Sequence, residues 1–265
     1  MHGPSFAAPA TRLLPEIGGI PGLEPGRLHE VHAESAHRAA ALAFALAQVG
    51  GPPASGPLFL IHSRGRTRWA RAMLHGDGLA RLGLDPARLT IVAAADGGGK
   101  GTAGGTARGN GLLRAGLDAA RCPALAGVVI ESAGRLPAYD LTASRRLALA
   151  AERSGGRVVV LRIDAEPRPS AAFTRWTIAS APSLALAGEA PGEPALVARL
   201  DRRRGAAAGQ EWRLEWDSDH GFFRPLPATP AGPASPAPAA LPGAVVPLAG
   251  LRTGTASGMQ GRCAA

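Results

Sequence analysis

Residues 33–40, AESAHRAA, follow a strand-like run, GRLHEVHA, at a position where a phosphate-binding loop could form. Such a loop, GxxxxGK[ST], uses glycines so that backbone N–H groups can wrap phosphate, and a lysine that reaches the terminal phosphates. Here the two glycine positions hold Ala33 and Arg38, and the lysine and hydroxyl positions hold Ala39 and Ala40. An arginine in place of the second glycine would fill the cradle, so we expect no nucleotide cofactor.

A second candidate phosphate loop, GGGKGT (97–102), contains the only lysine of the chain, Lys100. The motif would require glycine at position 94 and serine or threonine at position 101, where the sequence has Ala94 and Gly101. The surrounding segment 97–111 has eight glycines in fifteen positions. We therefore interpret it as a flexible insertion.

Three closely spaced histidines, His29, His32 and His37, raise the possibility of a metal site. On a strand, His29 and His32 would point to opposite faces, and no HExxH pattern is formed. We expect polar side chains around a strand end and no bound metal.

The composition limits the classes of protein to which the chain can belong. Of its 265 residues, 46% are hydrophobic and 18% charged, which excludes a small disulfide scaffold and a fully disordered chain. The net charge of +9 arises almost entirely from arginine and indicates a nucleic acid or an acidic protein surface as partner, or only a compositional bias. The two cysteines have no metal-ligand spacing, and no apolar run reaches about 18 residues. We expect a reduced, cytoplasmic protein that does not span a membrane.

Strand-like and helix-like runs alternate along the chain, which predicts an α/β fold with a mainly parallel sheet flanked by helices. The runs after residue 180 are separated by glycines and predict antiparallel strands at the C-terminal end. Expected parallel strands are 26–33, 57–63, 88–94, 125–132 and 157–164, and expected helices are 36–48, 67–74, 112–120 and 141–155. Expected antiparallel strands are SLALAG (183–188), 195–203 and 211–217.

The same patterns suggest a domain organisation. Residues 1–25 form an N-terminal lead segment, and residues 26–224 form one domain that carries the glycine-rich insertion 97–111. Residues 225–265 are rich in proline and alanine and hold only two charged side chains. Such a segment buries too little apolar surface to offset its ordering entropy, so we expect a disordered tail.

The order of these pieces resembles the RecA core, and the resemblance marks further catalytic positions. The general base of RecA would fall near Arg64, where the acid is replaced by a base. Glu131 and Ser132 stand where RecA has an Asp-Ser pair for magnesium. No glutamine occurs between Gln48 and Gln210, so the residue that senses the terminal phosphate is missing. The sequence therefore predicts a degenerate RecA-like domain that is not an enzyme.

Several segments are similar to the ImuA family, namely LPEIGGIPGLEPGRLHEV (14–31), LDPARL (84–89), LTASRRLALAAERSG (141–155), SAAFTRW (170–176) and RLDRRRG…EWRLEW (199–216). ImuA proteins are catalytically degenerate RecA relatives from bacterial SOS mutagenesis operons. The resemblance implies a non-catalytic adaptor in DNA repair, specifically SOS-induced error-prone translesion synthesis. It implies as partners an ImuB-type Y-family polymerase homologue and an error-prone C-family polymerase, with RecA and single-stranded DNA as further candidates. The alternatives are a RecA-like DNA-dependent ATPase and an SOS cell-division inhibitor.

Seven residues are candidate contacts to a partner or to DNA, and each also has a structural interpretation: Arg145, Arg146, Arg175, Trp176, Arg202, Arg203 and Arg204. Arg175 and Trp176 could instead lock a loop, with Trp176 packed on the sheet and Arg175 paired to an acid. The arginine run 202–204 is expected to face solvent, because adjacent arginines are rarely buried without acids nearby.

Overall fold

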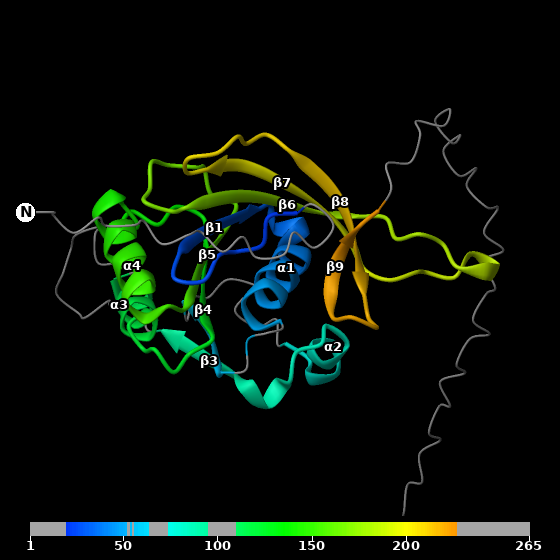
Figure 1. Cartoon of the computed structure of the whole chain (residues 1–265), viewed down its shortest axis with the longest axis horizontal. Coiled ribbons are helices and arrows are strands. Elements are labelled where there is room, and N and C mark those ends of the chain that lie inside the picture. Colours follow the sequence, from blue (N-terminus) through cyan, green and yellow to red (C-terminus); the bar gives the residue numbers. More distant parts are fainter. Residues whose placement is uncertain (1–19, 52–53, 55, 64–73, 95–109, 227–265) are drawn as a thin grey trace, which may run out of the picture. The chain divides into compact units, whose positions relative to one another are not determined.

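The computed structural model describes residues 20–51, 54, 56–63, 74–94 and 110–226, all of which belong to one compact unit. Their apolar runs form a nine-stranded sheet in the order β3-β2-β4-β5-β1-β6-β7-β8-β9 (Figure 1). The strands are β1 (Leu28–Ala33), β2 (Leu58–Ser63), β3 (Leu89–Ala94), β4 (Gly127–Ala133), β5 (Arg157–Ile163), β6 (Thr174–Ala181), β7 (Ala195–Arg203), β8 (Glu211–Asp217) and β9 (Phe222–Pro225).

The parallel part of the sheet is centred on β1, which lies between β5 and β6 and runs parallel to both. β4, β2 and β3 extend the parallel part beyond β5. Beyond β6, strands β7 to β9 continue as an antiparallel meander. Every residue of β1 and β5 is buried, as expected of strands that are covered on both faces. The predicted α/β fold class, a mainly parallel sheet flanked by helices with antiparallel strands at its C-terminal end, is confirmed.

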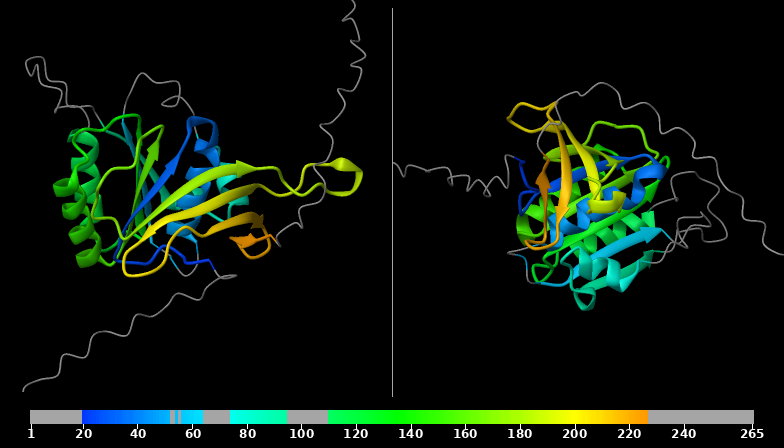
Figure 2. Two further views of the ribbon diagram at one scale, coloured as in Figure 1. Left: turned by 90° about the horizontal axis from the view of Figure 1, so that it is seen from above. Right: turned by 90° about the vertical axis from the view of Figure 1, so that its right-hand side faces the viewer.

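Helices cover both faces of the sheet: α1 packs on one face, and α3 and α4 lie side by side on the other (Figures 1 and 2). The helices are α1 (Arg38–Gly50), α2 (Gly76–Arg81), α3 (Asn110–Ala120) and α4 (Leu141–Ser154). Three short 3₁₀ turns are η1 (Ser35–His37), η3 (Pro86–Arg88) and η4 (Ala187–Glu189). The bounds of α4 follow from its sequence, since the Asp140 side chain accepts a hydrogen bond from the backbone N–H of Ala143 and Gly155 takes a φ of 76°.

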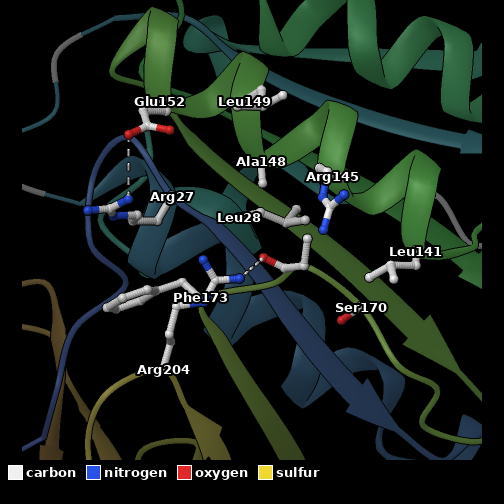
Figure 3. Close-up of a pocket in the computed structure, with 11 residues that line it drawn as sticks. Arg27, Leu28, Leu141, Arg145, Ala148, Leu149, Glu152, Ser170, Phe173 and Arg204 are labelled. Atoms are coloured by element: carbon white, nitrogen blue, oxygen red, sulfur yellow. Dashed lines mark hydrogen bonds and ion pairs between the residues drawn. The ribbon is translucent and has the colours of Figure 1, made fainter.

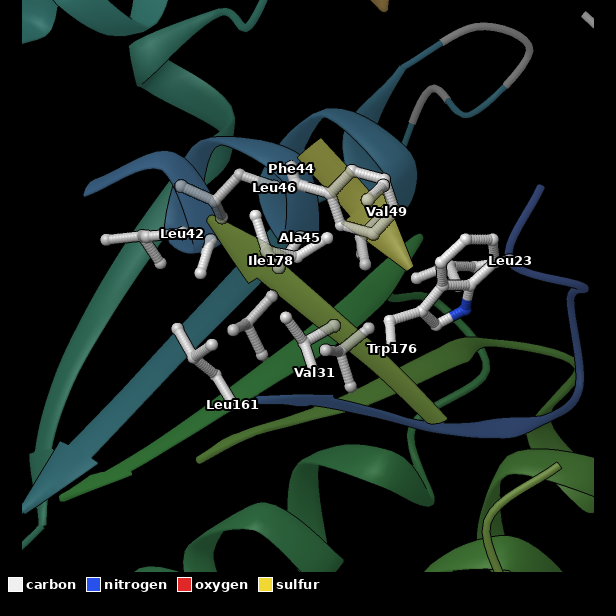
Figure 4. Close-up of a cluster of buried hydrophobic side chains, with 14 of the residues drawn as sticks. Leu23, Val31, Leu42, Phe44, Ala45, Leu46, Val49, Leu161, Trp176 and Ile178 are labelled. Carbon is white, nitrogen blue, oxygen red and sulfur yellow. The ribbon is translucent and has the colours of Figure 1, made fainter. Parts of the chain in front are cut away.

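The main core lies between α1 and the sheet (Figure 4). The Phe44 ring from α1 packs 5.7 Å from the Trp176 ring of β6, between ring centroids, and both side chains are fully buried. Val31 and Leu161 on the adjacent strands β1 and β5 lie directly opposite each other beneath α1. Burial of each large apolar side chain contributes about 1.5–3 kcal/mol. This core fixes the start of α1 relative to the ends of β1, β4 and β5.

The strand predictions for the C-terminal part need two corrections. SLALAG (183–188) is not a strand but belongs to the loop between β6 and β7, because Pro182 cannot donate to a ladder and Gly188 takes a φ of 76°. The first strand after β5 is instead β6, which begins inside SAAFTRW and buries Trp176 and Ile178 in alternation. The short strand β9 was not predicted.

Several predicted features lie outside the described residues. They include the lead segment up to residue 19, residues 67–73 of the expected helix 67–74, the position near Arg64, most of the glycine-rich insertion and residues 227–265. Strand β9 reaches Pro225, one residue beyond the predicted domain boundary, and the Leu226 N–H still donates to the Arg213 carbonyl. None of the helices in the described part of the chain has both the length and the apolar character needed to cross a membrane.

Candidate functional site

The candidate site lies where the chain passes from β1 into α1, at the carboxyl ends of the parallel strands. After Ala33 the chain forms the 3₁₀ turn Ser35–His37 and then enters α1 at Arg38. A phosphate loop would need a wider, glycine-rich turn whose N–H groups stay free for a ligand. Because β1, β5 and β4 are adjacent and parallel, Asp164 after β5 and Glu131 in β4 lie close to this turn.

Arg38 and Glu131 form a bidentate ion pair across this site. The Arg38 Nε donates to Glu131 Oε1, and Nη2 donates to Oε2 over 2.7 Å. The side chains of Arg38 and Glu131 are only 14% and 8% exposed. Two parallel charge-assisted hydrogen bonds are a strong and directional contact. Glu131, which the resemblance to RecA would place at the magnesium position, is therefore neutralised by Arg38.

Two N–H groups of the turn are also engaged by the protein itself. The Ser35 N–H donates to Asp164 Oδ1 over 2.7 Å, and the His37 N–H donates to the Glu34 carbonyl over 2.9 Å. A carboxylate thus lies at the turn where a phosphate loop would bind an anion. His37 Nδ1 accepts from the Ser180 backbone N–H over 3.2 Å, which ties the turn to β6 as well. Asp164 was not predicted as a site residue, and it takes a positive φ of 49°, which is uncommon outside glycine.

The SAAFTRW segment builds a buried hydrogen-bond chain. Trp176 Nε1 donates to Thr174 Oγ1 over 2.9 Å, and Thr174 Oγ1 lies 2.7 Å from His29 Nδ1. His29 Nε2 must carry its proton, because it lies 2.9 Å from the Glu24 carbonyl, which can only accept. Nδ1 then accepts from the Thr174 hydroxyl. Burial, together with the nearby charges of Arg157 and Arg27, lowers the pKa of His29 from 6.5 to about 4.

A second buried network surrounds Glu30 on β1. The Tyr139 hydroxyl donates to Glu30 Oε1 and the Arg175 Nε donates to Oε2, each over 2.7 Å. Burial alone would raise the pKa of Glu30, but the nearby polar groups of His32 and Ser170, the charge of Arg175 and the Tyr139 hydroxyl outweigh it and lower the pKa to about 2. The structural interpretation of Arg175 and Trp176 therefore matches the geometry: Arg175 is paired to an acid, and Trp176 has no exposed surface through which to contact a partner.

The arginine run 202–204 does not uniformly face solvent, and that expectation was wrong. The Arg202 guanidinium donates to the carbonyls of Ser170 and Ala172, the latter over 2.6 Å, and burial lowers its pKa. Arg203 pairs with Glu24 over 3.4 Å, and of the three only Arg204 is exposed. Backbone carbonyls accept from both terminal nitrogens of the half-buried Arg202 guanidinium, which forms no ion pair with a described acid.

The remaining candidates, Arg145 and Arg146, are both exposed on α4. Arg145 lines a pocket together with Arg204, whereas Arg146 does not (Figure 3). Arg175 and Arg202 lie opposite each other in the β6–β7 pairing.

The three histidines bind different partners: His29 bonds to Thr174, His32 to the Ala165 carbonyl and His37 to Ser180. Within the described ranges, no three His, Cys, Asp or Glu side chains are grouped as metal ligands. Contact with DNA or a partner stays a prediction for the six candidate arginines, Arg145, Arg146, Arg175, Arg202, Arg203 and Arg204.

The sequence of this chain is similar to that of known proteins. The protein ImuA of Caulobacter vibrioides, in strain NA1000 and in strain ATCC 19089, is 35% identical over 167 residues, which cover 57% of this chain and 60% of the relative. The chain is thus similar to ImuA over this region. The match to these ImuA proteins spans less than two thirds of their length. No protein-family model matches the chain. Among solved structures, the RadB recombinase superposes with a TM-score of 0.48 at 14% identity, covering 78% of this chain and 94% of the recombinase.

Proposed function

We propose that this chain is a non-catalytic accessory factor of SOS-induced, error-prone translesion DNA synthesis. In this role it binds an ImuB-type Y-family polymerase homologue and an error-prone C-family polymerase in the cytoplasm. The relationship to ImuA supports the pathway. RecA and single-stranded DNA are further candidate partners.

The Arg38–Glu131 ion pair is the observation that carries the non-catalytic part of the proposal. A working site needs a free acid for magnesium and free N–H groups for the phosphates. Here Glu131 is held by Arg38, and the Ser35 N–H is held by Asp164. To bind ATP and magnesium, the protein would have to break both contacts without the lysine that would compensate for them. These contacts favour a role in binding proteins over a role in hydrolysing nucleotide.

Co-purification tests this proposal. The full chain is co-expressed with a tagged ImuB-type protein from the same genome, and the complex is analysed by size-exclusion chromatography with and without ATP and magnesium. We expect a stable complex whose amount does not depend on nucleotide. Absence of the complex would contradict the adaptor role, and a complex that forms only with ATP would contradict the non-catalytic role.

The C-family polymerase is tested in the same format. We expect it to join the ImuB-type protein only when this chain is present, since an adaptor must bind both. If the two polymerase-like proteins associate equally well without the chain, the bridging part of the proposal fails.

A further inference from the structure

A groove runs along α4 on the face of the sheet opposite α1 (Figure 3). Its far wall is the segment Ser170–Phe173 with the start of β1, and its volume is about 330 Å³. It is separate from the Arg38–Glu131 site, none of whose residues line it.

Two leucines from α4 give the groove an apolar character. Leu141 and Leu149, both at the groove, are 48% and 46% exposed, which is high for large apolar side chains. Leu28 and Phe173 form the apolar floor and opposite wall. Exposed leucines beside such a floor indicate a surface that becomes covered when a partner binds.

Three arginines surround these apolar side chains: Arg27, Arg145 and Arg204. The one acid in the lining, Glu152, lies 4.0 Å from Arg27, and both side chains are exposed. Arg204 donates to the Ala171 carbonyl over 3.2 Å, and Arg145 forms no ion pair with any described residue. The groove therefore carries an excess of positive charge and is complementary to a negatively charged ligand.

The wall opposite α4 is fixed before any ligand arrives. The Ala171 N–H donates to Ser144 Oγ over 3.0 Å, and the Phe173 N–H donates to the Leu28 carbonyl over 2.6 Å. On its other side, Arg202 holds the Ser170 and Ala172 carbonyls. A wall that is already ordered loses little conformational entropy on binding. This gives Arg202 a positioning role for the groove.

We infer that this groove binds an acidic segment of a partner protein, whose carboxylates pair with Arg145 and Arg204 while its apolar side chains cover Leu141 and Leu149. The inference rests on the proposed role as a partner-binding factor, and it names the surface and the chemistry of the partner. A single-stranded nucleic acid fits less well, because such sites offer aromatic faces for base stacking. The only aromatic side chain of the groove, Phe173, has the Arg27 guanidinium 5.3 Å from its ring centroid.

A labelled peptide tests the groove in the full chain by fluorescence anisotropy. The probe is a fluorescein-labelled peptide of about 16 residues with leucines at i, i+4 and i+7 and glutamates beside them. We expect it to bind at least about tenfold more tightly than the same peptide with lysines in place of glutamates. Oligothymidylate is the nucleic-acid probe, and we expect it not to bind tightly to the groove.

Matched variants separate a specific groove from general basic charge. We expect Arg145→Glu to weaken peptide binding about tenfold, and Arg153→Glu, an exposed arginine of α4 outside the groove, to change it less than about twofold. Leu149→Ser should weaken binding about fivefold, whereas Leu186→Ser, an exposed leucine in the β6–β7 loop, should not.

Three outcomes would overturn the inference. The first two are no binding of the acidic peptide, and equal losses of peptide binding in Arg145→Glu and Arg153→Glu. The third is tight oligothymidylate binding that Arg145→Glu abolishes and Leu149→Ser leaves unchanged. The co-purification described above uses no peptide. If the ImuB-type complex forms but the peptide result is negative, the groove inference fails and the adaptor role stands.

Discussion

Acid should weaken the folded state through His29, since this side chain is buried as a neutral ring. Its Nε2–H donates to the Glu24 carbonyl and its Nδ1 accepts from the Thr174 hydroxyl, so a proton on Nδ1 would take away the acceptor of that hydroxyl. The pKa is lowered from 6.5 to about 4, first by burial and then by Arg157 and Arg27. Between these two pH values the unfolded chain binds the proton and the folded chain does not. Stability is therefore fully retained above about pH 6.5 and is lost progressively as pH falls toward 4.

The size of the loss of stability follows from the pKa shift of His29. One pKa unit corresponds to about 1.4 kcal/mol, so the full shift is worth about 3 kcal/mol, of which about 2 kcal/mol is lost between about pH 7 and pH 4.5. For a domain of this size the melting temperature should fall by about 4–8 °C from this group alone. Glu30 contributes little in this window, because its pKa is lowered from 4.5 to about 2 and its stabilisation is lost at lower pH.

The assay is a series of urea unfolding curves between about pH 7 and pH 4.5 for the natural sequence, His29→Gln and His75→Gln. Gln has no titrating group, so His29→Gln should lose about 2 kcal/mol less than the natural sequence over this range. His75 is exposed and serves as the matched control, whose pH dependence should equal that of the natural sequence.

If the free energy of unfolding depends equally on pH in the natural sequence and in His29→Gln, then His29 does not cause the loss of stability in acid. If the Gln variant does not fold, an NMR titration of His29 in the natural sequence decides the matter. A midpoint near 6.5 in place of about 4 would show that the ring is not held neutral.

Two further predictions concern the Glu30 network and the tail. Arg175→Ala should lower the free energy of unfolding by about 3 kcal/mol, measured in urea, because it leaves Glu30 buried without its partner. Arg199→Ala removes an exposed pair with Asp201 and should cost less than about 1 kcal/mol. Equal losses in the two variants would contradict a stabilising role of the buried ion pair. Deletion of residues 227–265 should change the melting temperature by less than about 2 °C, since the composition of this segment cannot support a core, and a larger drop would mean that the tail docks on the domain.

Much of the fold could be predicted from local patterns. Strands β2, β4 and β5 contain continuous apolar runs, because a strand covered on both faces needs no polar alternation. Helix α4 was bounded within one residue, since it ends at Gly155. SLALAG has the composition of a strand, but the proline before it and the positive φ of Gly188 prevent pairing. Strand β9 is four residues long, too short for its pattern to be distinguished from a loop.

The candidate site was predictable only in part. The sequence itself lacks the residues of a phosphate loop and has an arginine at the second glycine position. The contact of that arginine, Arg38, with Glu131, 93 residues away, follows only from the strand order. The roles of Asp164 and Ser180 likewise require β5 and β6 to flank β1. Arg202 was expected in solvent because backbone carbonyls that can satisfy a guanidinium leave no signal in the sequence.

Phosphate release from ATP, with and without single-stranded DNA, tests whether Arg38 and Asp164 block the positions that ATP and magnesium would need. We expect a rate equal to the protein-free background under both conditions, and no change in Glu131→Gln. Hydrolysis that is stimulated by single-stranded DNA and abolished by Glu131→Gln would contradict it.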